Sequence, residues 1–387
     1  MPGLCNVRWI PAHAFPPPLP KPAMVDAATE PVDMQPTAAA RAVVVHPPAP
    51  PQVHDLASRI TAGLAIHAPA PTKHGVNGSF FIRDKHGHRC AIFKPMNMEA
   101  GMPKNHRLGP GENVQFRESI LPGQGAGNEV LAYRLDRHAF EGRYGLPKTI
   151  LIKLSHPAFE GEELGSAQVF LSNAKPLSDL TQAEREDIPM KEWQKLNFRL
   201  ISGSTDAHFG NILYSTDDKK LYLIDSGDDF VGEKGQCQYY SPWAMMPKSN
   251  QLMTQDEYEF LSGLNVAEAM NVFAKAARAN EEQCPTLKVS DDKYLTQILR
   301  LKLAKVAGQM KLTQAEWFDI MTRHRDRYNM PVASNMEEVY RHHIRNCIGD
   351  GETWQKSTER VNWRHIEQEF KALAQQRINR RRMAIFR

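Results

Sequence analysis

The sequence has few cysteines and lacks long apolar runs. Its five cysteines are far apart among 387 residues, so neither a zinc site nor a disulfide framework is expected, and a reducing compartment is the default. No apolar run approaches the roughly 18 residues of a membrane span. Prolines interrupt the N-terminus, which argues against a secretory signal and favours a cytoplasmic or peripheral membrane location. A net charge of +4 is too small to indicate nucleic acid as a partner.

Residues 1–71 contain little that can form a core. They hold 15 of the 27 prolines, with few charges and few aromatic residues, so this segment is predicted to be mostly disordered. The exception is 53–66, where apolar residues recur at helical spacing and predict a short helix that packs against the folded part. A linker, a targeting arm and an export signal remain open as roles for the segment.

The chain is organised around residues 204–230, where two short apolar strands flank a polar turn. Asp206 precedes Asn211 by five positions, and the second strand leads into Asp225. Phosphoryl transfer needs a carboxylate that orients the attacking hydroxyl, and oxygen ligands that hold Mg²⁺ against the phosphates of ATP. We therefore predict that Asp206 is the catalytic base and that Asn211 and Asp225 bind Mg²⁺. An ordinary surface hairpin with acidic turns is the alternative for this pattern alone.

A second group of residues upstream fits the nucleotide side of the same reaction. Gly78 and Ser79 stand in a small-residue loop before two predicted strands, at 80–82 and 90–95. Such a loop lets backbone N–H groups approach phosphates. Lys94 lies near the end of the second strand, where its ammonium would reach the phosphates. Each feature alone is common, and a solvated strand end is the alternative for the lysine.

The segment that follows predicts a helix, then two further strands. Asn128 is expected to cap the helix and Glu129 to lie in its first turn, where it would pair with Lys94. Strands are predicted at 149–152 and 165–171, the second ending where two lobes would join. The residues expected to contact adenine there are Gln168, Val169, Phe170 and Leu171.

Several of these blocks, taken together and in this order, resemble the phosphatidylinositol 3/4-kinase superfamily. The closest resemblance is to the type II phosphatidylinositol 4-kinases, including their plant gamma relatives. The match covers roughly half of the chain, and its blocks are 78–81, 91–95, 125–133, 165–170, 205–211, 224–227 and 243–247. In the family pattern an arginine follows the catalytic aspartate, whereas here Ala207 stands in its place. His208 occupies a position that resembles the phosphatidylinositol 3-kinases more than the type II enzymes.

The resemblance implies an α+β, bilobal kinase-like fold with ATP and Mg²⁺ as cofactors. A β-rich N-lobe is expected at 73–172 and a helical C-lobe at 173–387. The implied reaction is phosphorylation of an inositol phospholipid, with His208 as a helper on the transferring phosphate or, alternatively, as a residue that stabilises the loop. A protein substrate and a non-catalytic nucleotide-binding scaffold remain as alternatives. The complete set of site residues argues against the scaffold.

The choice between lipid and protein substrates rests on little in the sequence. After the metal motif, only Lys234 is available to meet an inositol phosphate, and it stands among the carboxylates of Asp228, Asp229 and Glu233. This acidity weakens the lipid interpretation. The cysteine-rich insert of animal type II enzymes is absent, so membrane attachment by that route is not expected.

The remainder of the chain is predicted to be helical. Capping boxes begin at Thr181, Thr254 and Thr313. The segments with helical periodicity are 191–201, 265–280, 291–309, 313–327, 335–347 and 361–383. The basic end, 377–382, could contact an anionic membrane, although a solvated helix end, where cations are favourable, is the preferred interpretation.

Overall fold

The computed structural model describes residues 42–43, 51–72, 75–105, 120–232, 242–322, 324–325, 331–332, 334–348 and 353–385. All of these residues belong to one unit by their contacts. Glu233 and Lys234, and the predictions for residues 1–41, lie outside the described residues.

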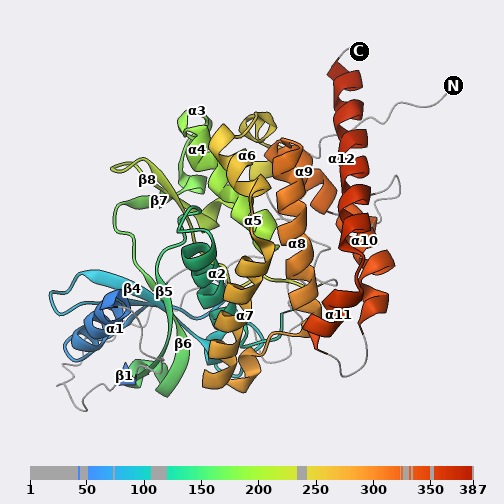
Figure 1. Ribbon diagram of the computed structural model, residues 1–387. Helices are drawn as coiled ribbons and strands as arrows, with labels where there is room; N and C mark the ends of the chain where they lie inside the picture. The colour runs from blue at the N-terminus through green and yellow to red at the C-terminus, as the bar shows by residue number, and fades with distance from the viewer. Residues whose placement is uncertain are drawn as a thin grey trace. The chain divides into compact units, whose positions relative to one another are not determined.

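The first part of the chain forms an antiparallel sheet with strand order β1-β5-β6-β4-β3-β2 (Figure 1). The predicted strands at 80–82, 90–95 and 149–152 are confirmed. The strand predicted at 165–171 begins earlier and ends at Val169. The strand bounds are β1 Ala42–Val43, β2 Ala70–Pro71, β3 Phe80–Arg83, β4 Arg89–Pro95, β5 Thr149–His156 and β6 Gly161–Val169.

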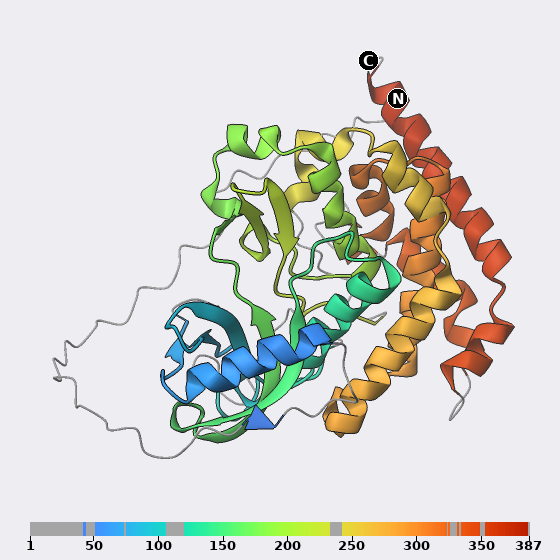
Figure 2. The same ribbon diagram turned by 60° about the vertical axis from the view of Figure 1, so that its left-hand side comes forward.

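The sheet is covered by one helix on each face. Figure 2 shows α1 (Pro51–Leu64) lying across the first face, where Ile60 packs with Ile150 and Ile152 of β5. The residue between these two, Leu151, packs with Val130 of α2 (Gly125–Ala139). Alternate residues of β5 therefore serve opposite cores, as the pleat of a strand requires. The helix predicted at 53–66 is confirmed as α1, and it packs on one face of the sheet.

The start of α2 differs from the prediction. Its first turn begins at Gly125, so Asn128 lies inside the helix and Glu129 lies one turn further on than expected. The carboxylate of Glu99 caps the helix instead, because it accepts the N–H groups of Gly125 at 2.9 Å and Ala126 at 2.7 Å. A buried carboxylate at a helix N-terminus meets both the unpaired N–H groups and the positive end of the dipole.

The predicted hairpin after Asp206 is confirmed as strands β8 (Ile212–Ser215) and β9 (Lys220–Leu223), which β7 (Ala174–Pro176) extends to a three-stranded sheet. The single helix predicted at 191–201 is divided. It consists of α4 (Met190–Trp193), one 3₁₀ turn, and α5 (Asn197–Ser202), which Gly203 ends in a left-handed conformation. The capping box at Thr181 is present at the start of α3 (Gln182–Asp187).

Helices make up most of the chain after residue 250 (Figure 1). The predicted helix at 291–309 is confirmed at both ends, whereas that at 313–327 ends at Met321. The capping box at Thr313 is complete, but at Thr254 only the Thr side chain accepts a bond. No described helix is long and apolar enough to cross a membrane. The remaining elements are α6 Gln255–Ser262, α7 Val266–Gln283, α8 Asp291–Gln309, α9 Gln314–Met321, β10 His324–Arg325, β11 Pro331–Val332, α10 Asn335–His343, α11 Trp354–Arg360 and α12 Trp363–Ile385.

Candidate active site

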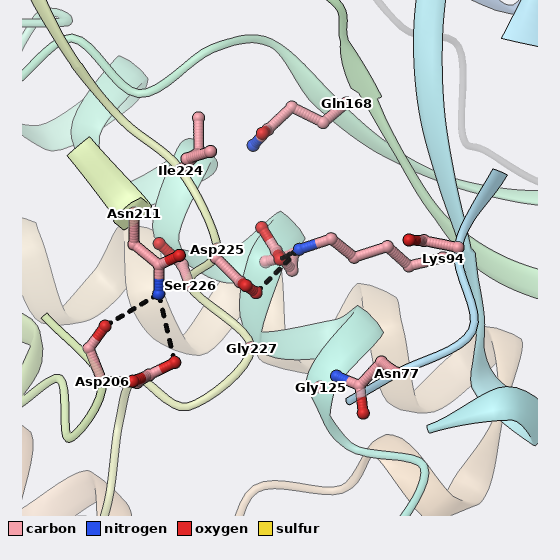
Figure 3. Close-up of polar contacts among 12 residues, drawn as sticks. Asn77, Lys94, Gly125, Gln168, Asp206, Asn211, Ile224, Asp225, Ser226 and Gly227 are labelled. Atoms are coloured by element: carbon pink, nitrogen blue, oxygen red, sulfur yellow. Dashed lines mark hydrogen bonds and ion pairs between the residues drawn. The ribbon is translucent and has the colours of Figure 1, made fainter. Parts of the chain in front are cut away.

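Three charged side chains from separate parts of the chain meet at Lys94 (Figure 3). The Lys94 ammonium, on β4, donates hydrogen bonds to Glu129 Oε1 on α2 and to Asp225 Oδ1 at 2.8 Å. Glu129 is buried, whereas the Asp225 side chain is 41% exposed. The predicted contact between Lys94 and Glu129 is therefore present, and Asp225 joins it as a third member.

The backbone at Asp225 has a conformation that few residues adopt. Its φ of 59° lies in the left-handed region, which is uncommon for residues other than glycine and is enriched for Asp and Asn. Such a conformation costs of the order of 1 kcal/mol or more and persists where the surroundings impose it, most often at functional sites. Here it directs the carboxylate from the end of β9 toward Lys94 (Figure 3).

The charges around Lys94 determine whether its side chain is protonated. Burial alone would lower the pKa of the ammonium, but the carboxylates of Asp225 and Glu129 raise it above its ordinary value. Burial also raises the pKa of Glu129, against the opposing charge of Lys94. Lys94 is therefore a fixed cation at neutral pH, and it is held between two carboxylates by charge-assisted hydrogen bonds.

Asp206 and Asn211 lie on the other side of Asp225 (Figure 3). The Asn211 side-chain amide donates to the backbone carbonyl of Asp206 at 2.9 Å and to its Oδ2 at 3.1 Å. Burial, followed by the negative charge of Asp225, raises the pKa of Asp206 above its ordinary value, while His208 and Asn211 oppose this. The three predicted catalytic and metal-binding residues are thus brought together, with Asn211 fixing the position of Asp206.

The donor set at this point fits Mg²⁺. Two carboxylates close enough to raise a pKa, together with the amide oxygen of Asn211, are hard oxygen ligands of the kind that Mg²⁺ prefers. No described residue donates a hydrogen bond to Asn211 Oδ1, which leaves that atom available as a ligand. A divalent cation here would remove the repulsion between Asp206 and Asp225.

His208 makes one local contact and one contact toward the predicted base. Its Nδ1 accepts the N–H of Gly210 at 2.9 Å and so caps the 3₁₀ turn Phe209–Asn211. The imidazole lies so close that a Cβ at position 210 would come within 2.7 Å of it, which explains the glycine. Because Nδ1 is the acceptor, the proton of the neutral ring is on Nε2, which lies 3.6 Å from Asp206 Oδ1. Both functions predicted for His208 remain compatible with this position.

A buried arginine that the sequence analysis did not single out connects the two loops of the site. Arg199 of α5 forms an ion pair with Asp229 at 3.2 Å and donates to Ser226 Oγ at 3.2 Å. Its second amino group donates to the backbone carbonyls of Asn211, at 3.3 Å, and Ile224. Arg199 therefore fixes the chain before β8 and the chain after β9 relative to each other.

Asn128 of α2 also holds the loop after β9, because its side chain donates to the carbonyls of Gly227 at 2.9 Å and Asp229 at 3.1 Å. The prediction that it caps α2 is wrong, since its side chain bonds to the loop after β9 and the helix begins before it. A signal for Arg199 does exist in the sequence, since a single charge stands within the apolar run 196–201. Such a charge, if buried, needs a partner, but the sequence does not show which one.

Two polar groups of the predicted phosphate loop already have partners near the ends of strands β2 and β4. The N–H of Gly78 donates to the Met98 carbonyl at 2.8 Å. The hydroxyl of Ser79 is bonded to that of Thr72 at 2.6 Å. Both groups already have a hydrogen-bond partner in this conformation, so their role in binding phosphate stays a prediction.

The predicted adenine segment lies where β6 leaves the sheet. The Gln168 amide donates to Thr149 Oγ1 at 3.0 Å. The N–H groups of Val169 and Phe170 donate to the carbonyls of Lys148 at 2.9 Å and Cys90 at 3.1 Å. Both groups already have acceptors, so a backbone contact with adenine would fall to carbonyl groups or to Leu171.

Comparison with known proteins gives related sequences, although no family model matches the chain. One relative is the phosphatidylinositol 4-kinase gamma 4 of Oryza sativa subsp. japonica, 26% identical over 331 residues, covering 80% of this chain and 54% of the relative. The phosphatidylinositol 4-kinases gamma 6 and gamma 7 of Arabidopsis thaliana are each 23% identical. Those matches cover 66% and 70% of this chain and 43% of each relative.

The chain thus spans about half the length of the curated relatives it matches. The names of these matched proteins agree with the resemblance found in the motifs. That resemblance is therefore confirmed. This chain is a relative of the plant proteins named phosphatidylinositol 4-kinase gamma.

Proposed function

We propose that the chain is an ATP- and Mg²⁺-dependent phosphotransferase of the bilobal phosphatidylinositol 3/4-kinase type, acting on an inositol phospholipid. The observation that carries the proposal is the convergence of Lys94, Asp225 and the Asp206–Asn211 pair at one place, from three separate segments. Phosphoryl transfer depends mainly on positioning and on charge neutralisation, and this set supplies both. A non-catalytic scaffold would not require a catalytic carboxylate held by its own asparagine.

Each residue has a step in this mechanism. Asn211 and Asp225 would hold Mg²⁺, which would supply charge neutralisation to the phosphates. Lys94, positioned by Glu129, binds the phosphates with its ammonium. Asp206 orients the attacking hydroxyl and accepts its proton. His208 Nε2 lies 3.6 Å from the Asp206 carboxylate, from where it would donate a hydrogen bond to the substrate.

A lipid is favoured over a protein as the substrate by three observations. The relatives carry the name phosphatidylinositol 4-kinase. The carboxylate of Asp229 is fully buried against Arg199, so part of the acidity that weakened the lipid interpretation does not face a substrate. Met245 and Leu252, which follow the metal-binding loop, are large apolar side chains with exposures of 73% and 66%, suited to contact with a membrane.

The experiment that tests the proposal is transfer of radiolabelled phosphate from ATP. Purified protein is given Mg²⁺ with liposomes that contain phosphatidylinositol, with liposomes that lack it, or with a protein mixture. We expect label in the lipid of the first sample. Label in protein alone would show that the substrate is a protein and not a lipid. Absence of transfer in every sample would contradict the proposal that the chain is an enzyme. Lys94→Ala, Asp206→Ala and Asp225→Ala should each abolish transfer.

Nucleotide binding can be tested separately from turnover. Mg-ATP at 100 times its dissociation constant should stabilise the folded protein by about 2.7 kcal/mol. The measurement is thermal denaturation with and without Mg-ATP at millimolar concentration. Absence of a shift with correctly folded protein would count against a nucleotide site.

A further inference from the structure

The contact between α10 and α12, in the last part of the chain, contains a compact group of metal-ligand side chains. His343 is the last residue of α10, and His365 and Glu369 lie one turn apart near the start of α12. One ligand atom from each of the three lies within 4.8 Å of the others. Figures 1 and 2 both show these two helices side by side.

We propose that His343, His365 and Glu369 form a binding site for a divalent transition-metal ion of the Zn²⁺ class. Two imidazoles and one carboxylate are the donors that Zn²⁺ takes in three-ligand sites, which keep a fourth position for water. The hard ions Mg²⁺ and Ca²⁺ prefer sets made of oxygen alone, so the two imidazoles select against them. None of the three residues belongs to the set proposed for phosphoryl transfer.

The spacing of the ligand atoms requires little rearrangement. His343 Nε2 and Glu369 Oε2 are 2.7 Å apart and share a hydrogen bond. Around a tetrahedral Zn²⁺ with ligand bonds of about 2.0–2.1 Å, two ligand atoms are about 3.3 Å apart. The metal would therefore replace the shared proton, which leaves to solvent, as this pair opens by about 0.6 Å and His365 turns inward.

The surroundings give the site a rigid base and an open side. Ile344, Ile366 and Phe370, each adjacent to a ligand residue in sequence, are completely buried in the helical core. The side chains of His343 and Glu369 are only 22% and 32% exposed, whereas His365 is exposed. The helices thus hold two ligands in place, and the third can close over an ion that enters from solvent.

Positive charge nearby sets the limit on affinity. Arg341 and Arg364 flank the ligand residues in sequence, and both are exposed to solvent, where their repulsion is screened. The C-terminal end of α10 favours a cation, since its carbonyl groups carry the negative end of the helix dipole. A bound ion would connect α10 to α12 directly and stabilise their packing.

The test uses the full chain without a histidine tag, titrated with Zn²⁺ in the presence of millimolar Mg²⁺, which occupies sites made of oxygen ligands. We expect one equivalent of Zn²⁺ to bind, measured by competition with a chromogenic chelator. At 100 times the dissociation constant, the melting temperature should rise by about 3 °C. Co²⁺ should give the visible absorption of a tetrahedral site with nitrogen and oxygen ligands.

Two variants and one control identify the residues. His365→Ala removes an exposed ligand together with its edge contact to the His343 ring, whose centroid lies 4.9 Å away, and Glu369→Gln keeps the shape of its side chain. Each should weaken binding at least tenfold. His342→Ala removes the neighbouring exposed histidine of the same helix, and it should bind Zn²⁺ as the unmodified chain does. The proposal is overturned if no saturable binding occurs, or if His365→Ala binds Zn²⁺ as tightly as the unmodified chain.

Discussion

Two groups of charged residues share the loop after β9, one through Asp229 and the other through Asp225. They differ in how their charges are balanced. In the buried pair, one arginine, Arg199, meets one carboxylate, Asp229, and both are almost completely inaccessible to solvent. At the candidate active site, the single ammonium of Lys94 contacts Glu129 and Asp225, and Asp206 adds a third carboxylate. The pair is balanced within the protein, whereas the site has an excess of negative charge.

This difference separates a structural role from a catalytic one. Arg199 also donates to backbone carbonyls on both sides of the hairpin, so its charge serves to fix the loops. Burial, followed by the charge of Asp225, raises the pKa of Asp206, and the excess of negative charge is a cost when no ligand is bound. A bound cation would offset that cost, which supports our proposal that the unbalanced group, and not the buried pair, binds Mg²⁺ and phosphates.

The largest expected effect comes from removing one charge of the unbalanced group. Asp225→Asn keeps the shape of the side chain but loses a carboxylate ligand, and turnover should fall by about 10³-fold or more, or at least 4 kcal/mol of transition-state stabilisation. The measurement is the phosphate transfer assay on folded protein. Asp218→Asn, in the exposed turn of the same hairpin, is the matched control and should keep full turnover. An active Asp225→Asn variant would remove this residue from the metal site.

Breaking the balanced pair should act mainly on stability. Arg199→Met leaves the Asp229 carboxylate buried without its partner, and the free energy of unfolding should fall by about 3–5 kcal/mol. The double variant Arg199→Met, Asp229→Leu removes both charges and should recover most of this loss. Its turnover should stay low, because the carbonyls of Asn211 and Ile224 lose their common donor. Denaturant unfolding and turnover are measured on the same preparations.

A result in which the double variant is as unstable as Arg199→Met would contradict a role of the pair as a balanced unit. Full turnover in the double variant would show that the loops keep their geometry without Arg199.

Sequence reasoning succeeded where the determining interactions are local. The hairpin from Ile212 to Leu223 and the helix 291–309 follow from apolar periodicity and turn residues within each segment. The contact of Lys94 with Glu129 was also predicted, although 35 positions separate the two residues, because it rested on a family pattern as well as on the chain itself.

Where distant residues decide, the local signals gave the wrong result. Asn128 is a good helix cap by residue type, but Glu99 caps α2 from 26 positions away, and the Asn128 side chain bonds to the loop after β9. The partner of Arg199 is 30 positions further along the chain, and no periodicity indicates it. Of the acidic residues after Asp225, Asp229 is paired internally with Arg199, and no local signal in the sequence indicates that pairing.

His208 lies beside Asp206, a member of the unbalanced group. Replacing His208 should lower turnover less than replacing Asp225 does. His208→Asn keeps a side-chain oxygen that can accept the Gly210 N–H, so the loop should hold its shape while the imidazole is lost. Turnover should fall by about 10²-fold, the scale of losing a positioned donor, with little change in melting temperature. His208→Gly loses the cap as well and should also be less stable. Unchanged turnover in His208→Asn would assign His208 to loop structure alone.

The smallest expected effect concerns the pH profile. Burial is the largest cause that raises the pKa of Asp206, and it acts whether or not a cation offsets the Asp225 charge. Because Asp206 must be ionised to act as a base, turnover should decline as the pH falls at values above those of an ordinary Asp. The charge of His208 opposes that shift, so His208→Asn should move the acid limb of kcat/KM slightly upward. A raised carboxyl pKa also means that the folded state binds its proton more tightly, so the contribution of Asp206 to stability is lost as the pH rises through its pKa. Asp206→Asn should flatten this part of the stability profile, and an unchanged profile would show that Asp206 is not the group whose pKa is raised.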